Sequence, residues 1–152
     1  MALSMRFGGA EREKVVIDTG VYVDYLRAGL HQDWVLGPAS RRVRFLSAVV
    51  LFELKLGART LRSRRVVDAL KLAFPSGRLI APSAEMFERA AILYRKVHGA
   101  SVGPPSGDRL GHFSDLMIAL TSWRIGAAVV TSNGRDFKRI AAHLPDFAWL
   151  EP

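Results

Sequence analysis

Short apolar runs alternate with longer stretches at helical spacing along most of this chain, and this alternation restricts the folds open to it. Strands joined by crossover helices in a parallel sheet produce such a pattern. The sequence therefore predicts an α/β fold with a central, mostly parallel sheet. The predicted strands are 14–18, 42–46, 78–81, 127–131 and 147–150.

Helix signals fill the segments between these strands. A helix is predicted from Thr19 to Gly29, followed by a short second helix around Gly37-Pro38. Ser47 is suited to cap a helix that runs toward Arg59, because its hydroxyl can accept a hydrogen bond from an amide of the first turn. Ser83 is suited in the same way to a helix that ends at Gly99. A further helix is expected from about Arg62 to the turn at 75–77.

Composition limits the class of protein. The length of 152 residues fits one domain with its own core, and we expect residues 1–13 to be a flexible N-terminal extension of a domain spanning 14–152. The absence of cysteine excludes disulfides, thiolate zinc sites and a cysteine nucleophile, and it fits the reducing cytoplasm in which we expect the protein. The longest apolar stretch, Leu46 to Leu54, is well short of the ~20 residues of a membrane span.

The chain is strongly basic. Twenty-two Lys and Arg residues against fourteen Asp and Glu leave a formal net charge of +8. Most of the excess is arginine, whose planar guanidinium suits phosphate, so that a nucleic-acid partner is expected, although basic surfaces also serve solubility. The densest basic runs, 41–44 and 62–65, are equally compatible with RNA contacts and with ordinary solvated faces.

Four carboxylates lie at the edges of apolar core segments, namely Asp18, Glu53, Asp115 and Asp136. Burying an unpaired carboxylate is costly, so their repetition indicates a shared purpose, most simply a bound divalent cation. The carboxyl ends of parallel strands meet at one edge of a sheet, where all four can converge. Two carboxylates about 4 Å apart repel by roughly 4 kcal/mol at an effective dielectric near 20, which Mg²⁺ or Mn²⁺ would relieve. Short polar side chains stand beside them at Thr19, Ser114, Thr131 and Asn133.

These acids belong to short motifs that occur in a fixed order: Asp18-Thr19 after an apolar strand, Ser47 with Glu53-Leu54 and Gly57-Ala58, Asp115 with Ile118-Ala119, and Thr131-x-Asn133-x-x-Asp136-Phe137. In this order and spacing they resemble the PIN-domain family, specifically the VapC-type toxins of toxin–antitoxin pairs. The resemblance spans about Val15 to the C-terminus. The chain departs from the commonest form in its N-terminal extension and in a long loop at 100–111.

The resemblance implies a three-layer α/β/α sandwich and a Mg²⁺- or Mn²⁺-dependent endoribonuclease that hydrolyses RNA by a metal-activated water. It implies that Asp18, Glu53, Asp115 and Asp136 bind the metal and that Thr19, Thr131 and Asn133 shape the pocket. It also implies a homodimer and a cognate VapB-like antitoxin that covers the active-site groove. No membrane partner is expected.

Each acid also has an ordinary structural interpretation. Asp18 could simply cap the following helix, Asp115 could stabilise a helix start, and Asp136 could be a turn acid beside Asn133-Gly134. Glu53 is the hardest to explain in this way, because apolar residues flank it on both sides. The hypothesis of a metal site therefore depends on the four acids acting together. Other aspartates in polar or turn contexts are expected to be solvated, namely Asp24, Asp33, Asp68, Asp108 and Asp146.

Histidine and tryptophan offer weaker signals. The histidines at 31, 98, 112 and 143 lack metal-ligand spacing. His112 could contact phosphate from its place near Asp115, although a plain loop or helix-start role is favoured. The tryptophans at 34, 123 and 149 could stack on bases, but core or dimer packing is favoured for them.

The sequence supports two other functions less well than a ribonuclease. A PIN-fold module that binds RNA or protein without catalysis is the alternative, and the complete set of four acids argues against it. A phosphatase or phosphotransferase of another α/β class lacks support, because the chain has neither a glycine-rich phosphate loop with Lys-Ser/Thr nor an Asp-x-Asp after the first strand.

Overall fold

The computed structural model describes residues 12–38, 41–105, 107 and 109–152. Within them, five strands form one sheet in the order β3-β2-β1-β4-β5, and every neighbouring pair is parallel. The predicted α/β fold is therefore confirmed. The strands are β1 (Glu13–Ile17), β2 (Arg42–Ser47), β3 (Leu79–Ile80), β4 (Ala128–Val130) and β5 (Trp149–Leu150).

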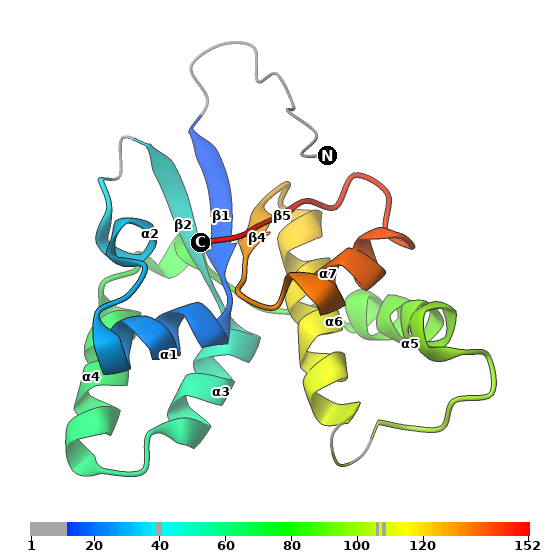
Figure 1. Cartoon of the computed structure of the whole chain (residues 1–152), viewed down its shortest axis with the longest axis horizontal. Helices are drawn as coiled ribbons and strands as arrows, with labels where there is room; N and C mark the ends of the chain where they lie inside the picture. Colours follow the sequence, from blue (N-terminus) through cyan, green and yellow to red (C-terminus); the bar gives the residue numbers. More distant parts are fainter. Residues whose placement is uncertain (1–11, 39–40, 106, 108) are drawn as a thin grey trace.

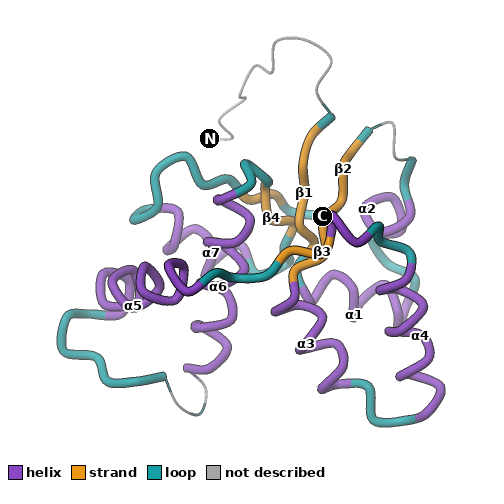
Figure 2. The backbone as a smooth tube through the Cα atoms, turned by 180° about the vertical axis from the view of Figure 1, so that it is seen from behind, coloured by secondary structure: helices purple, strands orange, loops and turns teal. Residues whose placement is uncertain are grey.

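Seven α-helices in the described part of the chain flank this sheet. Figure 1 shows α1 to α4 gathered on one side and α5 to α7 on the other, and the view from behind in Figure 2 shows the same two groups. This arrangement confirms the predicted three-layer α/β/α architecture. The helices are α1 (Thr19–Ala28), α2 (Gln32–Leu36), α3 (Ala48–Gly57), α4 (Leu61–Leu72), α5 (Ala84–His98), α6 (Arg109–Arg124) and α7 (Gly134–Ala141), with a short 3-10 turn η1 (Ser76–Arg78) before β3.

Local signals explain most helix boundaries. The Ser47 hydroxyl accepts a hydrogen bond from the Val49 amide at the start of α3, and Ser83 accepts one from Met86 at the start of α5. The short second helix lies before Gly37-Pro38 rather than around it, because Gly37 ends α2 in close contact with its backbone. A Cβ at Gly37 would lie only 2.0 Å from the Asp33 carbonyl oxygen, so only glycine fits there.

The interpretation of Asp115 as an acid that stabilises a helix start was wrong. Helix α6 begins at Arg109, which places Asp115 well inside it and shortens the predicted loop at 100–111. Gly111 did not delay the helix, since one glycine in a helix costs about 1 kcal/mol and packing of α6 against α5 offsets that cost. Asp108 and residues 1–11 of the extension predicted over 1–13 lie outside the described residues, and Glu13, its last residue, is the first residue of β1.

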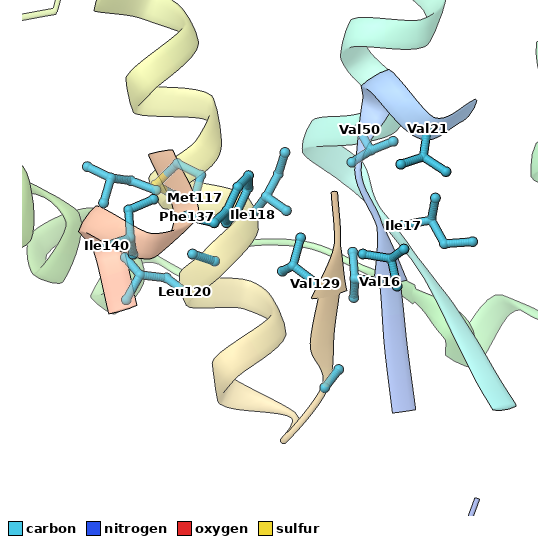
Figure 3. Packing of buried hydrophobic residues seen from close by; sticks show 14 of the residues in the cluster. Val16, Ile17, Val21, Val50, Met117, Ile118, Leu120, Val129, Phe137 and Ile140 are labelled. Carbon is cyan, nitrogen blue, oxygen red and sulfur yellow. The ribbon is translucent and has the colours of Figure 1, made fainter. Parts of the chain in front are cut away.

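The core lies between the central strands and the two helical groups. Val16 and Val129, on β1 and β4, are fully buried, as is Ile118 on α6, and Figure 3 shows these side chains packed together. Phe137 of α7 is also fully buried and lies 6.3 Å from the Phe147 ring. This packing fixes the ends of β1, β4 and α7 relative to α6.

The strand order creates a switch point between β1 and β4. The chain passes from β1 to β2 and β3 on one side, and β4 and β5 lie on the other side. In parallel sheets, the crevice beyond the carboxyl ends of the strands at such a point is the usual ligand site. The Asp18 amide donates a hydrogen bond of 2.9 Å to the Val130 carbonyl oxygen, so Asp18 lies at this point.

Candidate active site

Asp18 is held in one orientation by two donors. It follows β1 and caps α1, where its Oδ1 accepts a hydrogen bond of 2.8 Å from the Thr19 amide. Its Oδ2 accepts a hydrogen bond of 2.8 Å from the Thr131 hydroxyl, just beyond β4. The predicted helix cap is therefore present, and it is compatible with a second role, because each oxygen keeps a further lone pair.

Burial makes Asp18 difficult to ionise. Its side chain is 8% exposed, and this desolvation is the main cause that raises its pKa above the ordinary value. The Thr131 and Thr19 hydrogen bonds oppose that rise, and the negative charge of Glu53 adds to it. The negative charges of Asp18 and Glu53 therefore repel each other across the space between β1 and α3.

Glu53 is positioned by its neighbour across that gap. It lies about two turns into α3 and is half-buried, and its Oε2 accepts a hydrogen bond from the Thr19 hydroxyl. Lys55, the nearest basic residue along α3, pairs instead with Asp68 at 2.6 Å. Thr19 therefore contacts two of the predicted acids, Asp18 through its amide and Glu53 through its hydroxyl.

Asn133 connects the other two acids. Its side-chain amide donates hydrogen bonds of 2.9 Å to Asp136 Oδ2 and 3.5 Å to Asp115 Oδ2. Its backbone amide donates to the Thr131 hydroxyl at 2.9 Å, which links this pair to Asp18. Asp136 lies within the first turn of helix α7, where the helix dipole favours a carboxylate. It is therefore a helical residue and not an acid of the connecting turn at Asn133-Gly134.

Asp115 shows that the four acids share one electrostatic environment. Its pKa is raised to about 8, first by burial and then by the negative charges of Asp18, Asp136 and Glu53. The structure therefore brings together all four predicted acids, from the N-cap of α1 and from α3, α6 and α7. No three His, Cys, Asp or Glu side chains among the described residues are already placed as a metal-ligand set.

The donor set fits a hard divalent cation. The cluster offers carboxylate oxygens, and the threonines and Asn133 donate hydrogen bonds to all four acids. Burial, and then the charges of the other three acids, raise the pKa of Asp115. Mg²⁺ and Mn²⁺ prefer such oxygen ligands. That these residues bind metal remains a prediction.

Two further residues adjoin the acids: His112, which the sequence placed near Asp115 without assigning it to the metal site, and Gly134, which the sequence did not single out. His112 of α6 lies with its Nε2 4.0 Å from Asp136 Oδ2, although the sequence favoured a plain loop or helix-start role for it. A helical register for α6 would have placed it on the face of Asp115, three residues away. Gly134 opens α7 where a Cβ would lie 2.7 Å from Trp149 Cζ3, so the absence of a side chain lets α7 approach β5.

The aspartates outside the cluster behave as expected from their context. Asp24 lies 3.6 Å from His31, and Asp33 lies 3.2 Å from Arg42. Asp68 pairs with Lys55, and Asp146 is exposed in a turn. None of these described aspartates lies among the residues that perturb Asp115.

Some of the basic and tryptophan residues make structural contacts, and others are exposed. Arg42 lies over the Trp34 ring at 3.7 Å, and Arg44 donates to the carbonyls of Trp34 and Gly37, so these two arginines are structural. The second basic run lies on α4, where its arginines are exposed. Trp123 donates to the Pro145 carbonyl oxygen at 2.9 Å, as expected for a packing role.

No helix of the described residues is long and apolar enough to cross a membrane.

Known structures share this architecture. The chain is similar to VapBC2 from Rickettsia felis, bound to a DNA fragment from its promoter, with a TM-score of 0.64 and 20% identity over 91% of this chain and 98% of the other. It is also similar to VapBC-1 from nontypeable Haemophilus influenzae (TM-score 0.63, 19% identity, 91% and 97% covered). DNA-bound VapBC from Salmonella typhimurium gives a TM-score of 0.62 at 22% identity (91% and 98% covered). The comparison with curated proteins found no match.

At such identities, likeness of structure establishes the fold, and the sequence itself establishes the family. A family model of the PIN domain matches residues 15–143, a range that contains all four clustered acids and both threonines that hold them. The chain belongs to the PIN-domain family.

Proposed function

We propose that this protein is a metal-dependent endoribonuclease and the VapC-like toxin of a type II toxin–antitoxin pair, acting in the cytoplasm. The observation that carries the proposal is the shared electrostatic environment of Asp115, whose pKa is raised to about 8 by burial and three other acids. Repulsion of this kind is costly unless a cation relieves it. A bound Mg²⁺ or Mn²⁺ would supply a polarised water as nucleophile and neutralise charge on the phosphodiester.

The chain's own residues would prepare this site in three ways. Thr19 and Thr131 fix Glu53 and Asp18, so that their free oxygen lone pairs face the shared space with little loss of side-chain freedom on binding. Asn133 holds Asp115 and Asp136 near each other. Burial excludes water around Asp18, which strengthens every electrostatic interaction of its carboxylate.

A cleavage assay tests this proposal. The purified protein is incubated with total RNA and Mn²⁺, with and without chelator, and compared with the Asp18→Asn variant. We expect cleavage by the wild type to stop with chelator and to fall at least about 100-fold in Asp18→Asn, because a direct ligand should cost no less than its supporting residues. Asp24→Asn, at an aspartate of α1 that pairs with His31 just before α2, is the matched control and should cleave normally.

The alternative is a PIN-fold module that binds RNA or protein without catalysis. RNA binding that persists in all three proteins while cleavage never appears would favour this alternative. The clustering of the acids argues against it, because a binding module gains nothing from four carboxylates that repel RNA phosphates.

We propose that the antitoxin binds the surface formed by α3 and α4. Phe52 and Leu56, which flank Glu53 along α3, are 63% and 70% exposed, and Leu61 on α4 is 64% exposed. Arg62 and Arg65 line an open groove beside them together with Leu61 and Val66. Apolar and basic groups together suit an amphipathic segment that carries acidic residues.

This partner can be tested with the product of a neighbouring gene that encodes a small protein with a DNA-binding region. We expect the two proteins to co-purify and cleavage to be inhibited. Leu56→Glu should weaken the complex and leave cleavage by the free protein intact, and Lys71→Glu, on an exposed basic residue of α4, is the control. If Leu56→Glu binds as the wild type does, the antitoxin lies elsewhere.

A homodimer is also proposed. Apolar side chains remain exposed on α5 and α6, including Phe87, Ile92 and Leu110, which a second copy could cover. Light scattering of the purified protein would report twice the chain mass of 16.8 kDa if this is correct.

A further inference from the structure

His112 of α6 contacts both neighbouring helices, α5 and α7. Its Nε2 lies 4.0 Å from Asp136 Oδ2 of α7. Its ring stacks on His98 of α5, with ring centroids 4.9 Å apart and an angle of 12° between the ring planes. Arg139 of α7 donates a hydrogen bond of 3.4 Å to the Val97 carbonyl oxygen, so α5 and α7 are joined at the same place. The His112 ring is therefore held in one orientation toward Asp136.

The surroundings of the two ring nitrogens of His112 determine which of them carries hydrogen. Nδ1 is buried and has no hydrogen-bond partner among the described residues, whereas Nε2 faces a carboxylate. A neutral imidazole has one N–H donor and one bare acceptor nitrogen. A hydrogen on Nδ1 alone would bury an unsatisfied N–H and turn the lone pair of Nε2 toward the Asp136 oxygen, and both are costly. The neutral ring therefore carries its hydrogen on Nε2, and a protonated ring carries one there as well.

Asp136 Oδ2 is thus flanked by two N–H groups. The Asn133 side-chain amide donates a hydrogen bond of 2.9 Å to it, and Nε2–H of His112 faces it from α6. A distance of 4.0 Å is too long for a direct hydrogen bond, so the attraction acts through space or through a water. His112 and Asp136 are among the residues that line a cavity of about 10 Å³, which has room for roughly one water molecule. Two donors directed at Oδ2 favour Oδ1 as the oxygen that Asp136 offers to a cation.

We propose that His112 is a positioning residue, which orients Asp136 as a metal ligand through its Nε2–H. Groups that hold the ligating side chains of a metal site orient them and raise the affinity for the ion. His112 lies one helical turn before Asp115 on α6, so its attraction for Asp136 also restrains the separation of these two acids. The inference rests on the proposed metal-dependent function and adds a residue to its site.

Long-range ¹H–¹⁵N NMR of the metal-free protein tests the direction of this contact, because it distinguishes the two neutral forms of a histidine ring. We expect His112 to carry hydrogen on Nε2, or on both nitrogens. The spectrum of His112→Gln lacks the signals of this ring and so assigns them. A His112 ring with its hydrogen on Nδ1 alone would overturn the proposal.

Calorimetric titration with Mn²⁺ tests the consequence for the metal site. His112→Leu removes both ring nitrogens, whereas His112→Gln places an amide N–H close to the position of Nε2. We expect His112→Leu to bind Mn²⁺ about 10-fold more weakly than the wild type and His112→Gln to stay within about 3-fold of it. His143→Leu, at an exposed histidine outside the cavity lining, is the matched control and should bind as the wild type does.

Equal losses of Mn²⁺ affinity in His112→Leu and His112→Gln would overturn the proposal, because they would indicate that only the shape of the ring matters. Thermal unfolding shows whether each variant is folded, and the NMR measurement on the wild-type ring decides even if His112→Leu is not. If the wild-type protein itself binds no Mn²⁺, the proposed function fails and the positioning role fails with it. If the wild type binds Mn²⁺ and His112→Leu binds it equally well, the positioning role alone fails.

Discussion

The Thr131 hydroxyl donates a hydrogen bond of 2.8 Å to Asp18 Oδ2, although 113 positions separate the two residues in the sequence. Both side chains are buried, and each follows a central strand of the sheet. The same hydroxyl accepts a hydrogen bond from the Asn133 amide, so that Thr131 links Asp18 to the loop that precedes α7. A single hydroxyl thus orders both sides of the crevice between β1 and β4.

Replacing this hydroxyl should damage both stability and activity. Thr131→Val leaves a buried carboxylate oxygen and the Asn133 amide without their partner, at a cost of about 1–3 kcal/mol in the free energy of unfolding. Cleavage should fall about 10- to 100-fold, as for other groups that orient metal ligands. Urea unfolding and RNA cleavage measure both effects. Thr131→Ser retains the hydroxyl and should stay close to wild type, and equal behaviour of Val and Ser would contradict this role.

The raised pKa of Asp115 predicts an unusual dependence of stability on pH. Between the ordinary value of 3.8 and about 8, the folded protein keeps a proton on Asp115 that the unfolded chain has lost. The folded state binds more protons, so the free energy of unfolding of the metal-free protein must fall as the pH rises through this window, by up to about 1.4 kcal/mol per pH unit for one proton. Asp18, whose pKa is also raised, acts in the same direction.

Urea unfolding in the presence of a chelator at about pH 5 and about pH 8 measures this effect. Asp115→Asn cannot ionise and should therefore flatten the dependence. A wild-type stability that is constant or rises over this range would show that burial and the neighbouring acids do not hold a proton on Asp115 as the structure indicates.

The close packing at Gly134 predicts that a methyl group added there disturbs the site without contacting any of the four acids. Gly134→Ala would place its Cβ 2.7 Å from Trp149 Cζ3, so α7 must move away from β5, and we expect a loss of about 1–3 kcal/mol in stability. The shift carries Asp136 with it and should reduce cleavage. Gly111→Ala is the matched control, because a Cβ there meets nothing within 4 Å and helix propensity favours alanine by about 1 kcal/mol. Equal stability of the two variants would count against this packing.

The fold could be predicted because buried parallel strands leave a direct trace in sequence. Val15-Val16-Ile17 and Ala128-Val129-Val130 are continuous apolar runs, since helices cover both faces of the sheet. The edge strands β3 and β5 have two residues each and were predicted as four, because the apolar runs extend to Ala81 after β3 and begin at Phe147 and Ala148 before β5, outside the paired residues. The start of α6 was missed because glycine and proline punctuate residues 103–111, while packing against α5 sets the boundary.

Only the part of the site that lies at the ends of strands could be predicted from the sequence. Asp18 and Thr131 follow β1 and β4 directly, so their convergence follows from topology alone. The bridge from Asn133 to Asp115 depends on the angle between α6 and α7, and the stack of His112 on His98 depends on how α5 packs against α6. Sequence periodicity does not encode these relative placements.

Calorimetric titration with Mn²⁺ at about pH 8, near the raised pKa of Asp115, where about half of this carboxyl is ionised in the metal-free protein, tests the central claim most directly. The four carboxylates should bind the ion in the wild-type protein and in Asp24→Asn, and Asp115→Asn should bind at least about 10-fold more weakly, because it removes both a ligand and a negative charge. No heat of binding at millimolar Mn²⁺, or the same affinity in all three proteins, would contradict the account that these acids form one metal site.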